Sequence, residues 1–327
     1  MAYIHKAKSF TNPVLDENVA DPTIWKSGDT YHLFYTGNFT SPIYTSKDMV
    51  NWTNTNQCPF LQETIDQLFD IAKDYGSDPV IYAPTVVKND GLYLMYISLT
   101  WKCICVLCST NPMGPFRFYN NHPYVLVDEK ISGMNITFED TCVAQDLDGQ
   151  WYLMFGSHGN LTRTKLHHYG IDLLDKKFDH VAGCPKLFPR WIYEGLYAYY
   201  HDGYWYLFAA KGNYTSAKDP YEVVVGRCKT LGGVFRNKWG LRMDMGFAST
   251  ILKPDSTNVY LGGAHTGEIF TDDNGWNYIY YQRQRANEIH FRPLFLQRIY
   301  WGKDGWPYFK DGVTQMEEIM PAIKTKK

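Results

Sequence analysis

A phrase made of one tight turn and one short aromatic strand recurs five times along this chain of 327 residues. The tyrosines at positions 31, 93, 152, 206 and 278 mark the five copies, which begin every 54 to 72 residues. Each copy opens on a turn of the Asp-Gly or Asn-Gly type, which is typical of tight β-hairpins. A unit of this length holds a four-stranded sheet. Five such units predict an all-β fold, a five-bladed β-propeller.

Two other repeat-compatible architectures fit the pattern less well. A solenoid normally has shorter repeats and needs capping units at its ends. A two-sheet sandwich would show evenly spaced strands rather than a five-fold phrase. Only the segment around Glu63–Lys73 has a helical period, and no Pro/Ser-rich linker separates the copies. We therefore expect a single propeller domain over residues 1–327.

Composition narrows the range of partners. The formal net charge is −2, and no run of Lys and Arg forms the basic patch that nucleic-acid binding requires, so we expect no nucleic-acid partner. No apolar stretch is long enough for a transmembrane helix. The first residues lack the pattern of a signal peptide. We expect either an extracellular or periplasmic protein whose leader is absent from this sequence, or a cytoplasmic one, and in both cases a monomer.

The cysteines do not form a metal-binding motif. Cys103, Cys105 and Cys108 lie close together, but no second Cys or His pair follows at the spacing of a zinc site. Buried thiols on a strand are the better interpretation.

Acidic residues just upstream of the repeated phrases are candidates for chemistry. The innermost strand of each blade lines the central channel of a propeller, and ligands bind at one mouth of it. Asp21 lies in NVADPTIW, directly before the first copy. Pro22 favours an extended backbone at Asp21, which suits the start of an inner strand.

Two more carboxylates share one offset from the turn that follows them. Asp140 lies nine residues before Gly149 of the third copy, and Glu194 lies nine residues before Gly203 of the fourth. The equal offset predicts that both lie at the same height on neighbouring inner strands. A lone acid before a strand is usually a turn cap or a solvated edge, but three at such positions favour a functional site.

The segments that carry these acids, DPTIW, EDTCVAQDLDGQWYLMFGS and YEGLYAYYHDGYWYL, resemble the three acidic motifs of glycoside hydrolase family 43. The resemblance implies a five-bladed propeller that hydrolyses arabinan, xylan or related side chains with inversion. It also implies that Asp21 is the general base and Glu194 the general acid. Asp140 would orient the acid and raise its pKa. These roles match the carboxylate pair that inverting hydrolysis requires.

Further segments resemble the arabinan-cleaving branch of this family, among them YEVVVGRCKTLGGVF and HFRPLFLQRIYWGKDGWPYF. His265 matches a histidine near the channel axis that contacts a cation through water, and calcium is the ion that oxygen ligands favour. A hydrogen-bonded core histidine is the alternative. The resemblance implies no cofactor for the chemistry itself. The chain departs from the family pattern at Tyr82, Thr85, Thr141 and Gln282.

Tyr82, Ser157 and His158 are candidate sugar contacts, with inner-strand packing as the alternative. The expected substrate is a plant cell-wall oligo- or polysaccharide containing α-L-arabinofuranosidic linkages. A β-xylosidase or an arabinofuranosidase acting on xylan side chains is the alternative within the family. A non-catalytic carbohydrate-binding propeller and a sialidase-like enzyme are the rivals outside it. The sequence leaves endo- and exo-action open.

Overall fold

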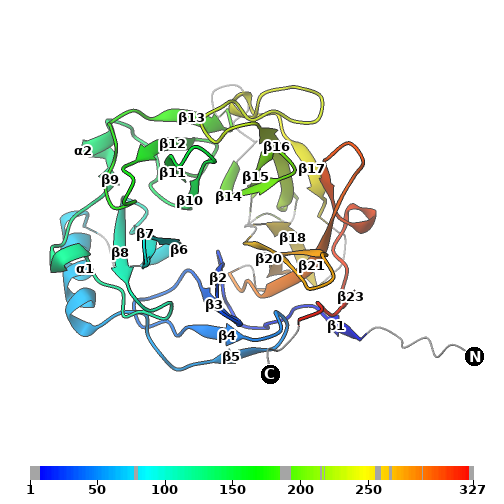
Figure 1. The fold of residues 1–327 in the computed structure, drawn as a ribbon, viewed down its shortest axis with the longest axis horizontal. Coiled ribbons are helices and arrows are strands. Elements are labelled where there is room, and N and C mark those ends of the chain that lie inside the picture. Colours follow the sequence, from blue (N-terminus) through cyan, green and yellow to red (C-terminus); the bar gives the residue numbers. More distant parts are fainter. Residues whose placement is uncertain are drawn as a thin grey trace, which may run out of the picture.

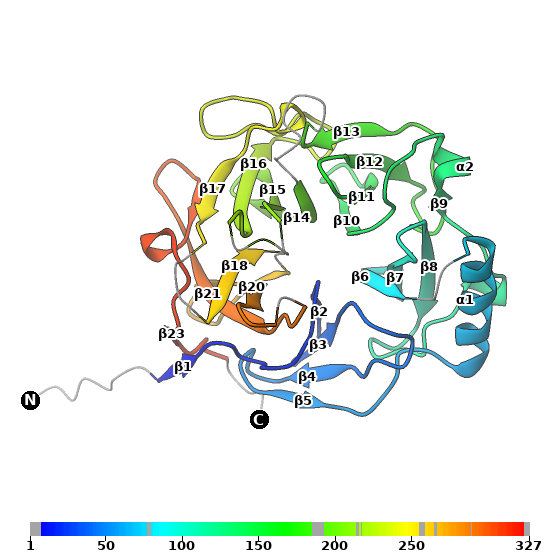
Figure 2. The ribbon, with the colours of Figure 1, turned by 180° about the vertical axis from the view of Figure 1, so that it is seen from behind.

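The computed structural model describes residues 8–76, 80–184, 193–213, 216, 218–254, 259–264, 267–288 and 290–323. Five antiparallel sheets stand in a ring around one axis (Figure 1), and the view from behind shows the same ring (Figure 2). In four of these sheets the strands follow one another from the axis outward in chain order, and in the fifth β18 and β19 both pair with β20. The predicted five-bladed β-propeller is confirmed.

Blades 1 and 2 are built from β2 to β9. Blade 1 contains β2 (Thr23–Ser27), β3 (Thr30–Phe34), β4 (Tyr44–Ser46) and β5 (Trp52–Asn54). Blade 2 contains β6 (Ile81–Asn89), β7 (Leu92–Leu99), β8 (Cys103–Ser109) and β9 (Val127–Asp128).

Blades 3 to 5 complete the ring. Blade 3 contains β10 (Cys142–Gln145), β11 (Trp151–Phe155), β12 (Leu161–Leu166) and β13 (Asp179–Ala182). Blade 4 contains β14 (Tyr193–His201), β15 (Tyr204–Lys211), β16 (Glu222–Cys228) and β17 (Ser249–Leu252). Blade 5 contains β18 (Tyr260–Ala264), β19 (Ile269–Thr271), β20 (Asn277–Arg285), β21 (Leu294–Trp301) and β22 (Pro307–Tyr308).

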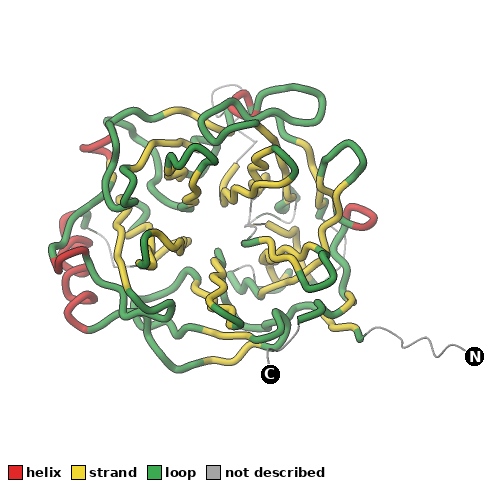
Figure 3. Tube along the Cα trace, in the orientation of Figure 1, coloured by secondary structure: helices red, strands yellow, loops and turns green. Residues whose placement is uncertain are grey.

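Helices are short and lie outside the blades (Figure 3). The helix expected near Glu63–Lys73 is α1 (Gln62–Asp74), which packs a stripe of apolar residues against the rim of blade 2. The others are α2 (Glu129–Ser132) and three 3₁₀ turns, η1 (Tyr119–Asn121), η2 (Met243–Met245) and η3 (Lys310–Gly312). Within the described ranges no helix is long and apolar enough to cross a membrane.

The repeated tyrosines occupy the second strand of each blade, and all five are buried. The turn before this strand has two residues in blades 1, 2 and 4, namely Gly28–Asp29, Asp90–Gly91 and Asp202–Gly203. In the Asp90–Gly91 and Asp202–Gly203 turns both residues have positive φ, between 44° and 82°. This is the conformation of a type I′ hairpin, and it explains the Asp-Gly pairs.

The cysteines are free thiols, and Cys103, Cys105 and Cys108 are buried on β8 as expected. No group of three or more His, Cys, Asp or Glu side chains in the described part of the chain could hold a metal ion.

The ring closes where the first and last described strands pair. β1 (Ser9–Thr11) and β23 (Glu317–Ile319) form a two-stranded antiparallel sheet. Directly after β1, the buried Asn12 side chain donates to the carbonyls of Leu296 (2.8 Å) and Gln315 (3.0 Å) and accepts from the Leu296 N–H (2.9 Å). Every polar group of this amide is therefore used to hold the segment before blade 1 on blade 5.

Candidate active site

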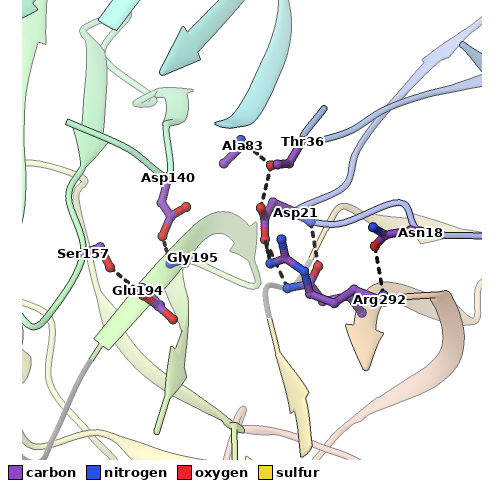
Figure 4. A network of polar contacts seen from close by, with 10 residues as sticks. Asn18, Asp21, Thr36, Ala83, Asp140, Ser157, Glu194, Gly195 and Arg292 are labelled. Atoms are coloured by element: carbon purple, nitrogen blue, oxygen red, sulfur yellow. Dashed lines mark hydrogen bonds and ion pairs between the residues drawn. The ribbon is translucent and has the colours of Figure 1, made fainter. Parts of the chain in front are cut away.

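A cavity of about 370 Å³ lies at the axis, where the inner strands of blades 1 to 4 begin. It contains all three predicted carboxylates together with Tyr82 and His158. The other residues that line it are Trp101, Thr137, Glu139, Tyr221 and Arg292. Asp21 and Arg292 lie on one side, and Asp140, Glu194 and Ser157 on the other (Figure 4).

A β-bulge at the start of the inner strands directs side chains into this cavity. Asp21, Ala83, Asp140 and Gly195 all have positive φ, between 39° and 61°, and they occupy corresponding places in blades 1 to 4. In blades 2 and 4 the strand register shifts at this point. A bulge of this kind redirects neighbouring side chains and is common beside active sites. The extended backbone expected at Asp21 is therefore wrong, because the bulge overrides the preference set by Pro22.

The prediction that Asp140 and Glu194 lie at equal height is also wrong. By its backbone conformation Asp140 corresponds to Gly195, and Glu194 corresponds to Glu139. The two turns differ in length: residues 146–150 separate the paired residues of β10 and β11, whereas only residues 202–203 separate those of β14 and β15. Counting back from the turn glycine therefore does not give equivalent positions.

Asp21 is held by donors from three parts of the chain. Its Oδ1 accepts from Arg292 Nη1 at 2.7 Å and from Gln282 Nε2 at 3.1 Å, and its Oδ2 accepts from Thr36 Oγ1 at 2.5 Å. The Asp21 N–H donates to Gln282 Oε1 at 2.6 Å. The side-chain amide of Gln282 therefore holds both the backbone N–H and the carboxylate of Asp21. This set of donors suits an ionised carboxylate in a fixed position.

Glu194 has the properties of a carboxylic acid that stays protonated near neutrality. Burial raises its pKa to about 7, and the charges of Glu139 and Asp21 contribute to the rise, whereas the Ser157 hydroxyl and Arg292 oppose it. Ser157 Oγ donates to Glu194 Oε2. Burial and like charges are the usual means by which enzymes raise the pKa of a catalytic acid.

Asp140 is 8% exposed and contacts the strand that carries the acid. Its Oδ2 accepts from the Gly195 N–H at 3.0 Å, so it holds the backbone next to Glu194. Burial and the charges of Glu139 and Glu194 raise the pKa of Asp140 well above its usual range. The charges of Asp140 and Glu194 act on each other, so the role of Asp140 in raising the pKa of the acid stays a prediction. The charge of Glu139 also contributes to the raised pKa of Glu194, and Glu139 was not identified from the sequence.

The predicted sugar contacts separate into two groups. Tyr82 and His158 line the cavity, whereas Ser157 is 2% exposed and lies behind Glu194. Trp101, which sequence reasoning missed, is 44% exposed, and its ring lies 5.8 Å from that of Tyr82 at an angle of 39°. The two rings form an aromatic wall against which a sugar ring can stack.

The cation site predicted at His265 lies outside the described residues. A smaller cavity of about 180 Å³ contacts the inner strands, and Glu268 is the carboxylate among its described lining residues. The two oxygens of Glu268 already accept from Thr23 Oγ1 and the Ile24 N–H. Calcium binding stays a prediction.

This propeller brings a carboxylate fixed by an arginine and a carboxyl group of raised pKa into one cavity at its axis, as the hydrolysis of a glycosidic bond requires. The family model "Glycosyl hydrolases family 43" matches residues 10–307. The chain belongs to this family, and it is a glycoside hydrolase.

Similar proteins include both arabinan- and xylan-related enzymes. An extracellular exo-α-(1→5)-L-arabinofuranosidase of Cellvibrio japonicus is 26% identical, over 89% of this chain and 86% of that protein. A β-xylosidase of Bacillus subtilis is 25% identical, over 92% of this chain but only 57% of that protein. The solved structure of an α-L-arabinanase mutant of Cellvibrio cellulosa superposes with a TM-score of 0.75 at 23% identity, covering 91% of this chain and 96% of that one. At this identity the superposition confirms the fold.

Proposed function

We propose that this chain is an inverting glycoside hydrolase that cleaves α-L-arabinofuranosidic linkages in arabinan or arabino-oligosaccharides. The observation that carries the proposal is the pairing of two unlike carboxyl groups in one cavity. Asp21 is fixed by Arg292, Gln282 and Thr36, whereas burial raises the pKa of Glu194 to about 7. Inversion needs one group that accepts a proton and one that donates it.

Each group has one step in this mechanism. Glu194 donates its proton to the leaving glycosidic oxygen as the bond to the anomeric carbon breaks. Asp21 takes a proton from a water molecule that attacks the opposite face of that carbon. The product sugar therefore has the inverted configuration. Asp140 positions the acid through the Gly195 N–H.

Arabinan is favoured over xylan as the substrate by the relatives. The exo-arabinofuranosidase of Cellvibrio japonicus aligns over most of its own length, whereas the Bacillus subtilis β-xylosidase aligns over about half of its length. Solved arabinanases of both endo and exo types share the fold. We keep β-xylosidase or arabinofuranosidase action on xylan side chains as the second candidate function.

Sizing of the products identifies the substrate. We expect release of arabinose or short arabino-oligosaccharides from linear arabinan and debranched arabino-oligosaccharides, with little release from an aryl β-D-xyloside. Chromatography of early time points shows whether single sugars or mixed oligomers form first, which distinguishes exo- from endo-action. Release of xylose alone contradicts the arabinan proposal, and inactivity on all three supports a non-catalytic sugar-binding role.

The pH dependence of kcat/KM reports the protonation of the acid. Because Glu194 must carry a proton and burial raises its pKa to about 7, we expect kcat/KM to fall above about pH 7, by roughly tenfold per pH unit. Glu139→Gln removes a like charge that contributes to this rise, so its decline should begin at lower pH. A pH–rate profile of both proteins with one arabino-oligosaccharide, whose leaving group needs a proton, tests this. An unchanged decline in the variant contradicts the assignment of Glu139 as a charge that acts on Glu194.

We further propose an extracellular or periplasmic location, supported by the extracellular Cellvibrio japonicus relative, and a monomeric state. A calcium ion in the central channel is proposed on the family resemblance at His265. It has no role in the proton transfers described above.

A further inference from the structure

One wall of the catalytic cavity is formed by residues 137–140, which are fixed to blades 2 and 3. Phe138 is 2% exposed and stacks on Phe155 with ring centroids 5.7 Å apart. Its N–H donates to the Trp101 carbonyl (2.9 Å), and its carbonyl accepts from Ser98 Oγ (2.6 Å). Phe138 is thus held in the core, whereas Thr137 and Glu139 on either side of it line the cavity.

Glu139 has no step in the proposed mechanism. It is a fourth carboxylate beside a base, an acid and the residue that positions the acid. Burial raises its pKa, while Thr137, His158 and Ser157 lie close enough to favour its charged form. A partly buried carboxylate with no task in proton transfer requires another explanation, because burying it has a cost in free energy.

Glu139 keeps hydrogen-bonding capacity toward the cavity. Ser157 has a single hydroxyl proton, which it donates to Glu194. The hydroxyl of Thr137 favours the charged form of Glu139, and its oxygen is buried and so is not exposed to a molecule in the cavity. A carboxylate offers about four lone-pair sites. Glu139, which lines the cavity, can therefore accept hydrogen bonds from a bound molecule.

We propose that Glu139 forms a binding subsite for the hydroxyl groups of the neutral sugar held in the catalytic cavity. The Glu139 carboxylate accepts hydrogen bonds from one or two sugar hydroxyls. Tyr82 and Trp101 provide the stacking surface in the same cavity. A few well-placed polar groups beside an aromatic wall are what fixes the orientation of a small ligand. The inference rests on the proposed function and names the part of the cavity that recognises the sugar.

A cycle of side-chain and hydroxyl deletions tests the subsite. The substrates are an aryl α-L-arabinofuranoside and its 2-, 3- and 5-deoxy analogues, and the enzymes are the wild type, Glu139→Ala and Glu139→Gln. Measurements are made about two pH units below the wild-type decline, so that Glu194 stays protonated in every protein. Glu129→Gln is the matched control, because Glu129 is exposed on the neighbouring α2.

We expect at least one deoxy analogue to lose roughly 10- to 100-fold in kcat/KM with the wild type, the size typical of a hydrogen bond to a charged group. The same analogue should lose no more than about twofold with Glu139→Ala, because the partner of the missing hydroxyl is gone. Glu139→Gln, which keeps an acceptor, should retain part of the discrimination.

Equal losses for every analogue in the wild type and in the variants overturn the subsite, since a purely structural role would lower all rates together. Failure of the proposed function has a different signature: the wild type would not cleave any arabinofuranoside. In that case the same cycle with an aryl β-D-xyloside and its deoxy analogues tests the subsite independently. Thermal melting confirms that each variant is folded.

Discussion

Replacing Asp21 by asparagine should lower kcat by roughly 10²- to 10⁴-fold, the range typical for loss of a general base. Asparagine keeps the shape of the side chain and can still accept from Arg292 or Thr36, but it cannot take a proton from the attacking water. KM should change much less, because the cavity keeps its form. The rate is measured on an aryl arabinofuranoside whose leaving group needs no protonation, so that only the attack on the sugar limits it.

Azide distinguishes loss of the base from general damage. A small anionic nucleophile attacks without a base, so azide should restore turnover in Asp21→Ala and form a glycosyl azide of inverted configuration. Asp29→Asn in the same blade is the control, because Asp29 is exposed and pairs only with surface groups such as Lys47. Wild-type activity in Asp21→Asn would exclude Asp21 as the base.

Replacing Glu194 by glutamine should produce a loss that depends on the leaving group. A sugar alkoxide needs a proton to depart, so we expect loss of roughly 10³- to 10⁴-fold on arabino-oligosaccharides, at the upper end for general acid catalysis. A dinitrophenyl leaving group departs without a proton, so the loss there should be about tenfold or less. The measurement is kcat/KM over a series of aryl arabinosides of falling leaving-group pKa.

The pH profile gives a second readout. Because the group that must be protonated is gone, the fall of kcat/KM above about pH 7 should disappear in Glu194→Gln. Glu63→Gln on the exposed face of α1 serves as the control. An equal loss for all leaving groups, with the wild-type decline at high pH retained, would assign the acid to another residue.

The blades could be predicted from the sequence because their signals are local. A hairpin turn followed by a buried tyrosine strand is defined within about ten residues, and α1 by its own apolar period. The three carboxylates proposed to act in catalysis could be selected because each lies next to such a landmark. The same reasoning was wrong about the backbone conformation at Asp21 and about which residue of blade 4 corresponds to Asp140. The bulges at Asp21 and Asp140 leave no clear mark in the composition, and the turn after β10 is longer than the one after β14.

The environment of the carboxylates could not be predicted because it is assembled from distant segments. Arg292 and Gln282 are more than 260 residues from Asp21, and they meet it only because blade 5 closes against blade 1. Gln282 was noticed as a departure from the family pattern, but its hydrogen bonds to both ends of Asp21 required the structure. Trp101 and Thr137 come from loops between strands, where periodicity gives no direction for a side chain.

The closure of the ring has a consequence for catalysis. The proposed base, Asp21, lies in blade 1 and accepts hydrogen bonds from two residues of blade 5. Its surroundings therefore form only where the first and last blades are in contact. The proposed acid, Glu194, and Asp140 lie on blades 4 and 3, which follow each other directly in the sequence. Partial opening at β1 and β23 would therefore separate Asp21 from Arg292 and Gln282 while the acid remained intact. The hydrogen bonds of Asn12 hold the segment before blade 1 on blade 5. Together with the pairing of β1 and β23 at the outer rim, they therefore keep Asp21 in place for proton transfer at the axis.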